Sequence, residues 1–127
     1  MIHYVMVGTN RFPEAMAFYD ALMADMGTDR IYETDRMVGW GWGIGKPMFI
    51  LCKPHDGQPA SVGNGCMTAF EVDSPGTVDR LHARVLQLGG RSEGDPGPRG
   101  EHIHAGYWRD LDGNKFNFIC YLKPVTG

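Results

Sequence analysis

The chain has 127 residues and a mass of 14.1 kDa, the size of one domain or of two small halves that share a core. Its apolar fraction of 43% can supply that core, and its net charge of −3 argues against a nucleic-acid-binding module, which usually carries a clustered basic face. No apolar run approaches the roughly 18 residues of a membrane span, and the start lacks the pattern of a signal peptide. We therefore expect a cytoplasmic protein with neither a nucleic-acid nor a membrane partner.

Glycine is the unusual component of the chain, with 18 residues, about twice its average share. The glycines and the eight prolines stay below the range of low-complexity disorder, so we expect turns, helix ends and cavity walls. The three cysteines, Cys52, Cys66 and Cys120, are an odd number and lie far apart. This pattern favours reduced thiols over a disulfide framework.

Two amphipathic helices are predicted, at about residues 13–26 and 75–88. Each begins at a proline and is followed by a glycine, and the second pair, Pro75 and Gly89, lies 62 residues after Pro13 and Gly27. The apolar stripes match at the same offset, with Met16, Tyr19, Met23 and Met26 against Val78, Leu81, Val85 and Leu88. The shared ends and stripes indicate an internal repeat.

Strand-like segments surround each helix in the same order. They cover residues 2–7, 30–34, 37–42 and 47–53 in the first half, and 66–72, 91–93, 102–109 and 115–122 in the second. Two stretches rich in glycine and proline, 54–65 and 94–100, are predicted as loops. The fold class is therefore α+β, with two β-α-β-β-β modules. We expect one domain over residues 1–127, with module 1 at about 1–54, a linker at about 55–65 and module 2 at about 66–127.

Two motifs carry a family resemblance that covers essentially the whole chain. Ala17-Phe18-Tyr19 follows a strand that bears His3, and Arg-Asp-Leu-Asp-Gly-Asn-Lys occupies residues 109–115 before the last strand. With the paired modules, these motifs make the chain resemble the vicinal oxygen chelate superfamily. That superfamily includes glyoxalase I, extradiol dioxygenases, fosfomycin-resistance enzymes and bleomycin-binding proteins. The resemblance implies a curled mixed sheet around a cavity, a small-molecule ligand and a homodimer.

The resemblance also implies one divalent metal ion (Zn, Ni, Fe or Mn), held by histidines and glutamates from the first and last strands of each module. Such an ion acts as a Lewis acid on two adjacent substrate oxygens. His3 matches the first-strand histidine, whereas Asn117 stands where the last-strand glutamate is expected, and residues 37–52 contain no Asp or Glu. His102 and His104, two residues apart on a predicted strand, are further metal candidates; the alternative is a pair of polar residues at a strand edge.

Candidate ligand-pocket residues come from three segments. Val38, Trp40 and Trp42 alternate with glycines on one strand, so the tryptophans either line the cavity or pack in the core or a dimer interface. Asn117 and Tyr121 share the strand face opposite the apolar Phe116, Phe118 and Cys120. Arg99, in the second glycine- and proline-rich stretch, is either a clamp for a carboxylate or a solvated surface charge.

Three functions follow from these residues. The first is a glyoxalase-like enzyme of the lyase or isomerase type, which acts on a small oxygenated metabolite through an incomplete metal site; the residues identify no catalytic group. The second is a metal-free small-molecule-binding protein of the bleomycin-resistance type. The third is a structural or regulatory dimer with a vestigial cavity.

Overall fold

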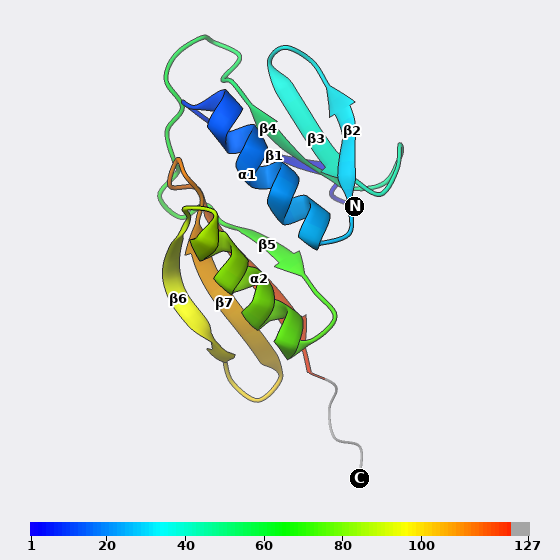
Figure 1. The fold of residues 1–127 in the computed structure, drawn as a ribbon, viewed down its shortest axis with the longest axis vertical. Helices are drawn as coiled ribbons and strands as arrows, with labels where there is room; N and C mark the ends of the chain where they lie inside the picture. Colours follow the sequence, from blue (N-terminus) through cyan, green and yellow to red (C-terminus); the bar gives the residue numbers. More distant parts are fainter. Residues whose placement is uncertain (123–127) are drawn as a thin grey trace. The chain divides into compact units, whose positions relative to one another are not determined.

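The computed structural model describes residues 1–122, which form two helices and eight strands. The chain divides into two compact units, Met1–Gly63 and the residues from Asn64 onward. Each unit holds one helix and one four-stranded mixed sheet, in the order β-α-β-β-β (Figure 1). The predicted α+β class and the paired modules are therefore confirmed. Neither helix of residues 1–122 is both long and apolar enough to cross a membrane.

The first unit is built on a sheet with the strand order β1-β4-β3-β2. Strands β1 and β4 are parallel, and the other neighbouring pairs are antiparallel. The elements are β1 (Tyr4–Gly8), α1 (Phe12–Asp25), β2 (Asp29–Glu33), β3 (Met37–Gly41) and β4 (Met48–Cys52).

Helix α1 begins one residue earlier than predicted and packs against β2 and β4. Pro13 lies in its first turn, where the missing N–H removes no helical hydrogen bond. Gly27 adopts a φ of +88° just after the helix, the left-handed conformation in which glycine ends helices at low cost. The predicted glycine stop is therefore confirmed at this position.

The core of the first unit lies between α1 and one face of its sheet. Tyr19 of α1 is fully buried, and its ring lies 5.7 Å from the ring of Trp40 and 4.8 Å from that of Phe49. Val38 and Leu51 are buried on the same strand face. Alternation along β3 and β4 therefore sends these side chains toward the helix.

The second unit repeats this arrangement with the strand order β5-β8-β7-β6. Helix α2 packs against β6, β7 and β8, and Ser74 caps its start by accepting a 3.1 Å hydrogen bond from the Thr77 N–H. The elements are β5 (Thr68–Glu71), α2 (Pro75–Gln87), β6 (Arg91–Pro98), β7 (Ile103–Arg109) and β8 (Lys115–Tyr121).

Strand β6 is longer than predicted. Residues 94–98, expected as part of a loop, pair with β7, so the loop prediction is wrong for them. The register shifts between Ser92 and Gly94 and again between Gly94 and Gly97. Such irregularities bend a strand, and an edge strand tolerates prolines that cannot donate to a neighbour. This segment can therefore join the sheet despite its composition.

The turn between β7 and β8 sets the register of the last two strands. The Asp110 carboxylate accepts hydrogen bonds from the backbone N–H groups of Asp112 and Asn114, at 3.0 and 2.9 Å. Gly113 has a φ of +92°, so the predicted hairpin is confirmed with glycine where the turn requires it. Arg109 and Lys115 flank the turn and face each other across the two strands, which aligns Tyr107 with Asn117.

Candidate functional site

Each sheet has one face that packs on its helix and a second face, which we call the open face. Directly paired residues of neighbouring strands point to the same face. In the second unit, Trp108, Phe116 and Phe118 are fully buried on the helix side. The open face of that unit carries Ala69, Glu71, Tyr107, Arg109, Lys115, Asn117, Ile119 and Tyr121.

Asn117 is the most unusual residue of the second open face. Its side chain is 2% exposed, and its Oδ1 has no hydrogen-bond partner within the described part of the chain. An unpaired buried polar group costs about 1–3 kcal/mol, so such atoms are rare in native proteins. Asn117 Oδ1 is therefore an acceptor whose partner the described residues do not supply.

Tyr107 lies directly opposite Asn117 on the neighbouring strand. Two cations contact its ring: the Arg99 guanidinium lies 5.5 Å and the Lys115 ammonium 5.8 Å from the ring centroid. Both distances are within the range of cation–π attraction. Backbone carbonyls hold Arg99 in place, because its Nη2 donates to the Asp95 oxygen at 2.8 Å and its Nη1 to the Gly97 oxygen at 3.2 Å.

A further cation on this face is already neutralised. The Arg109 Nη2 lies 3.0 Å from Glu93 Oε1, and its Nη1 donates to the Gly113 oxygen at 2.9 Å. The hydrogen bond from Arg109 lowers the pKa of Glu93 and raises the pKa of Arg109. Lys115, by contrast, makes no ion pair within residues 1–122. We call Arg99, Tyr107, Lys115 and Asn117 the Tyr107 cluster; its uncompensated charge is positive.

The open face of the first unit has a different chemistry. Tyr4, Met6 and Tyr32 are 42–50% exposed there, and Met37, Met48, Ile50 and Cys52 share the face. Burial raises the pKa of the Cys52 thiol, which keeps that thiol protonated and poorly nucleophilic. Methionine and tyrosine side chains form an adaptable apolar surface, and Asp29 of β2 carries the charge at its edge.

The predicted pocket residues fall into two groups. Arg99 and Asn117 come together at Tyr107, and Tyr121 lies on the same open face, 61% exposed. The tryptophans separate. Trp40 is 1% exposed and belongs to the core against α1, whereas Trp42 follows β3 and is 60% exposed.

The three metal-candidate histidines occupy unrelated surroundings. His3 is exposed one residue before β1, and His102 is exposed one residue before β7. His104 faces the helix side of its sheet, where its Nε2 lies 2.8 Å from Asp79 Oδ1 of α2. Within residues 1–122, no three His, Cys, Asp or Glu residues form a group that could hold a metal ion.

A family model identifies the relatives of this fold. The model of the Glyoxalase/Bleomycin resistance protein/Dioxygenase superfamily matches residues 1–118. The chain belongs to this superfamily. The resemblance inferred from the motifs is therefore confirmed. A search of the curated proteins returns no significant match.

Solved structures of the superfamily share the fold. A glyoxalase/bleomycin resistance protein from Albidiferax ferrireducens T118 is 33% identical, with a TM-score of 0.87 over 98% of this chain and 99% of that one. A glyoxalase/bleomycin resistance protein/dioxygenase family enzyme from Burkholderia phytofirmans PsJN is 19% identical, with a TM-score of 0.75 over 94% and 97% of the two chains. A lactoylglutathione lyase from Agrobacterium tumefaciens is also 19% identical, with a TM-score of 0.68 over 94% and 92%. The last two likenesses concern the fold alone.

The metal ion implied by the superfamily resemblance does not fit the donors of either unit. A divalent cation is normally held by three or four nitrogen, sulfur or oxygen ligands. Strand pairing places thioethers, one thiol and the Asp29 carboxylate on the first open face, and the Asn117 amide and the Glu71 carboxylate on the second, which also carries the Lys115 ammonium. In neither unit do three His, Cys, Asp or Glu side chains of residues 1–122 come together as a metal site. A positive charge in this place opposes a second cation. The metal-ligand role of His3, His102 and His104 thus remains a prediction that neither unit supports by itself.

Tyr107 and Lys115 were not predicted as site residues. A signal for both was present, because the Asp110–Asn114 turn places Arg109 opposite Lys115. Counting two residues away from the turn along each strand pairs Tyr107 with Asn117 on the same face. The contact between Arg99 and the Tyr107 ring was not predictable in this way, because it depends on the bulged path of β6.

Proposed function

We propose that the chain is a small-molecule-binding protein of the Glyoxalase/Bleomycin resistance protein/Dioxygenase superfamily that works without a metal ion. Its ligand is a small oxygenated anion bound at the Tyr107 cluster. The observation that carries this proposal is the buried, unpaired Oδ1 of Asn117 beside two cations on the Tyr107 ring.

The chemistry of the cluster specifies what the ligand must present. The Asn117 oxygen accepts a hydrogen bond, so the ligand needs a hydroxyl or N–H donor there. The Lys115 ammonium attracts a carboxylate or another anionic group. A hydroxyl near a carboxylate in one small molecule meets both requirements. The resulting ligand class is a hydroxy acid or a related oxygenated acid.

The same residues support binding over glyoxalase-like catalysis. Proton transfer next to a carbonyl requires a basic carboxylate or imidazole within hydrogen-bond reach of the substrate. Asn117 occupies the place of the expected glutamate, and its amide neither accepts nor releases a proton at neutral pH. The Glu93 carboxylate is held by a hydrogen bond from Arg109, which lowers the pKa and the basicity of that carboxylate. The lyase prediction from the sequence has no comparable support.

We also propose that the protein is a homodimer, as the superfamily resemblance implies. The first open face exposes Tyr4, Met6 and Tyr32, and a second copy would remove such apolar surface from water. Light scattering at micromolar concentration should give twice the mass of 14.1 kDa. A monomer under these conditions would contradict this part of the proposal.

Metal analysis combined with a ligand screen tests the proposed function. The purified protein should contain no near-stoichiometric Zn, Ni, Fe or Mn and should gain none on incubation with these ions. Hydroxy acids should raise its melting temperature, because a ligand of the folded state stabilises it by mass action. Lys115→Gln should remove the shift, and Lys46→Gln, at the exposed β3–β4 turn, should retain it. Near-stoichiometric metal that disappears in His3→Ala would instead support the enzyme hypothesis.

A further inference from the structure

A cavity lies in the first unit, at the ends of two of its strands. It occupies about 370 Å³ between the segment after β1 and the segment after β4. These two strands are parallel, so their carboxyl ends meet at one edge of the sheet, and both segments leave from there. The volume is within the range of small-molecule sites. No part of the proposed function at the Tyr107 cluster involves this cavity.

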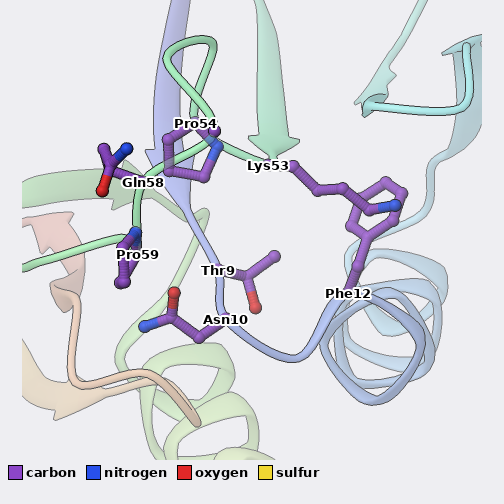
Figure 2. Close-up of a pocket in the computed structure, with 8 residues that line it drawn as sticks. Thr9, Asn10, Phe12, Lys53, Pro54, Gln58 and Pro59 are labelled. Carbon is purple, nitrogen blue, oxygen red and sulfur yellow. The ribbon is translucent and has the colours of Figure 1, made fainter.

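The cavity has a positive wall. Among its eight lining residues only Lys53 is charged. Its ammonium lies 5.1 Å from the centre of the Phe12 ring, and Figure 2 shows the side chain extended over that ring. Within residues 1–122 Lys53 makes no ion pair, so its charge remains uncompensated. An aromatic ring beside the ammonium limits its motion without neutralising it.

The opposite wall is held in place by paired hydrogen bonds. The Asn10 side chain donates to the Ala60 oxygen at 2.9 Å and accepts from the Ala60 N–H at 2.6 Å. Gly8 lets this segment lie close, because a Cβ at that position would lie 2.9 Å from the Ala60 Cβ. The stretch of residues 54–63, predicted from composition as part of a linker, is therefore anchored to the first unit and forms a cavity wall.

The remaining lining gives the cavity a mixed character. Phe12, Pro54 and Pro59 present apolar surface, and Gln58 adds an exposed amide on the same side as Pro59 (Figure 2). Small-molecule sites combine mainly apolar walls with a few polar groups that set orientation. An ammonium facing apolar walls selects a ligand with one anionic group on an apolar body.

We propose that this cavity is a binding site for a small organic carboxylate, whose anionic group pairs with Lys53 and whose apolar part contacts Phe12 and the prolines. The cavity belongs to the first unit, whereas the Tyr107 cluster belongs to the second. The two proposals therefore stand or fall independently.

Titration of the full-length protein with sodium benzoate at constant ionic strength tests this site. Amide resonances of residues 8–12 and 53–60 should shift saturably in two-dimensional NMR spectra. Lys53→Gln should weaken binding about tenfold, because a charge-assisted hydrogen bond is lost. Gln58→Glu, a change at an exposed position, should also weaken binding by placing a negative charge beside the anion.

Matched controls separate the loss of this site from a change in net charge or a loss of folding. Lys46→Gln removes a charge elsewhere and should leave the benzoate shifts at residues 53–60 unchanged. Each variant should keep the wild-type melting temperature within a few degrees, which verifies that it is folded. The proposal would be overturned by unchanged resonances in the wild type or by equal affinity in Lys53→Gln. Equally tight binding of benzyl alcohol, or of inorganic phosphate alone, would overturn the assignment to an organic carboxylate.

Discussion

The indole Nε1 of Trp40 donates a 3.1 Å hydrogen bond to Asp20 Oδ1, and the same carboxylate binds Arg30 through both of its oxygens. Asp20 lies on α1, Trp40 on β3 and Arg30 on β2, so one carboxylate joins the helix to two strands. The N–H of a buried tryptophan usually has a hydrogen-bond acceptor, and Asp20 supplies it for Trp40. Of the two alternatives that strand alternation left open for Trp40, a cavity wall or the core, the structure shows the core.

Loss of the Asp20 carboxylate should make the first unit less stable. Arg30 and Trp40 lower the pKa of Asp20 below its ordinary value of 3.8. The carboxylate therefore contributes stability above that value, and the contribution is lost as the pH falls through the lower pKa of the folded state. Because Asp20 is 41% exposed, we expect Asp20→Asn to cost only about 1 kcal/mol at pH 7.

Urea unfolding at pH 7 and at pH 3 measures this difference. The stability gap between wild type and Asp20→Asn should narrow at the lower pH, as the wild-type carboxylate takes up its proton. Asp35→Asn, in the exposed turn between β2 and β3, is the matched control and should have little effect at either pH. A gap of the same size at both pH values would contradict an ionised, stabilising Asp20.

Gly90 lies where the chain after α2 passes too close to Val85 of α2 and Arg109 of β7 for any side chain to fit. A Cβ at this position would lie 2.5 Å from Val85 Cγ1 and 2.9 Å from the Arg109 backbone oxygen. Gly90→Ala should therefore lower the free energy of unfolding by about 2 kcal/mol, the usual cost of overpacking. Gly27→Ala, where only the φ of +88° opposes a side chain, should cost about 1 kcal/mol. Equal urea midpoints for Gly90→Ala and the wild type would contradict this packing.

The repeat was predictable because its signals are local. The prolines that begin the helices, and Gly27 and Gly89 that follow them, act through backbone conformation and depend little on distant residues. The β6 strand was missed for the opposite reason. Its residues 94–98 have the composition of a loop, and only the neighbouring strand β7 and two register shifts let them pair.

The candidate site was predictable only where strand register decides it. Alternation along β8 predicted that Asn117 lies on the face opposite Phe116 and Phe118, and the buried Phe rings agree with it. The same rule left Trp40 ambiguous, because a period of two does not tell which face meets the helix. His104 shows the same limit, since its contact with Asp79 depends on how α2 crosses the sheet.

The three cysteines should differ sharply in reactivity. Cys66 is exposed, whereas Cys52 and Cys120 are buried, and all three are free thiols. Burial also raises the pKa of Cys52, which reduces its reactive thiolate fraction. A colorimetric disulfide reagent at pH 8 should therefore label one thiol quickly in the native protein and three in guanidinium chloride. Cys66→Ser should abolish the fast phase, and a persistent fast phase would contradict the burial of the other two.

Replacement of Asn117 by leucine should stabilise the protein while it removes ligand binding. Leucine has the same branched side-chain shape as asparagine and leaves no unpaired amide in the buried position. Since an unsatisfied buried polar group costs about 1–3 kcal/mol, we expect a gain of about 1 kcal/mol in the free energy of unfolding. The thermal shift produced by hydroxy acids should disappear, because the acceptor for the ligand hydroxyl is gone.

Asn114→Leu separates this effect from a general benefit of leucine in β-hairpins. The Asn114 side chain is also buried, but its Nδ2 donates to Asp110 Oδ2 at 2.9 Å. Its replacement breaks that hydrogen bond and should cost about 1–3 kcal/mol by leaving the aspartate short of a donor. Opposite signs for the two variants in urea unfolding would mean that Asn117 is kept at a cost in stability. A clear loss of stability in Asn117→Leu would mean that the amide is already satisfied without a ligand, which removes the main support for binding at the Tyr107 cluster.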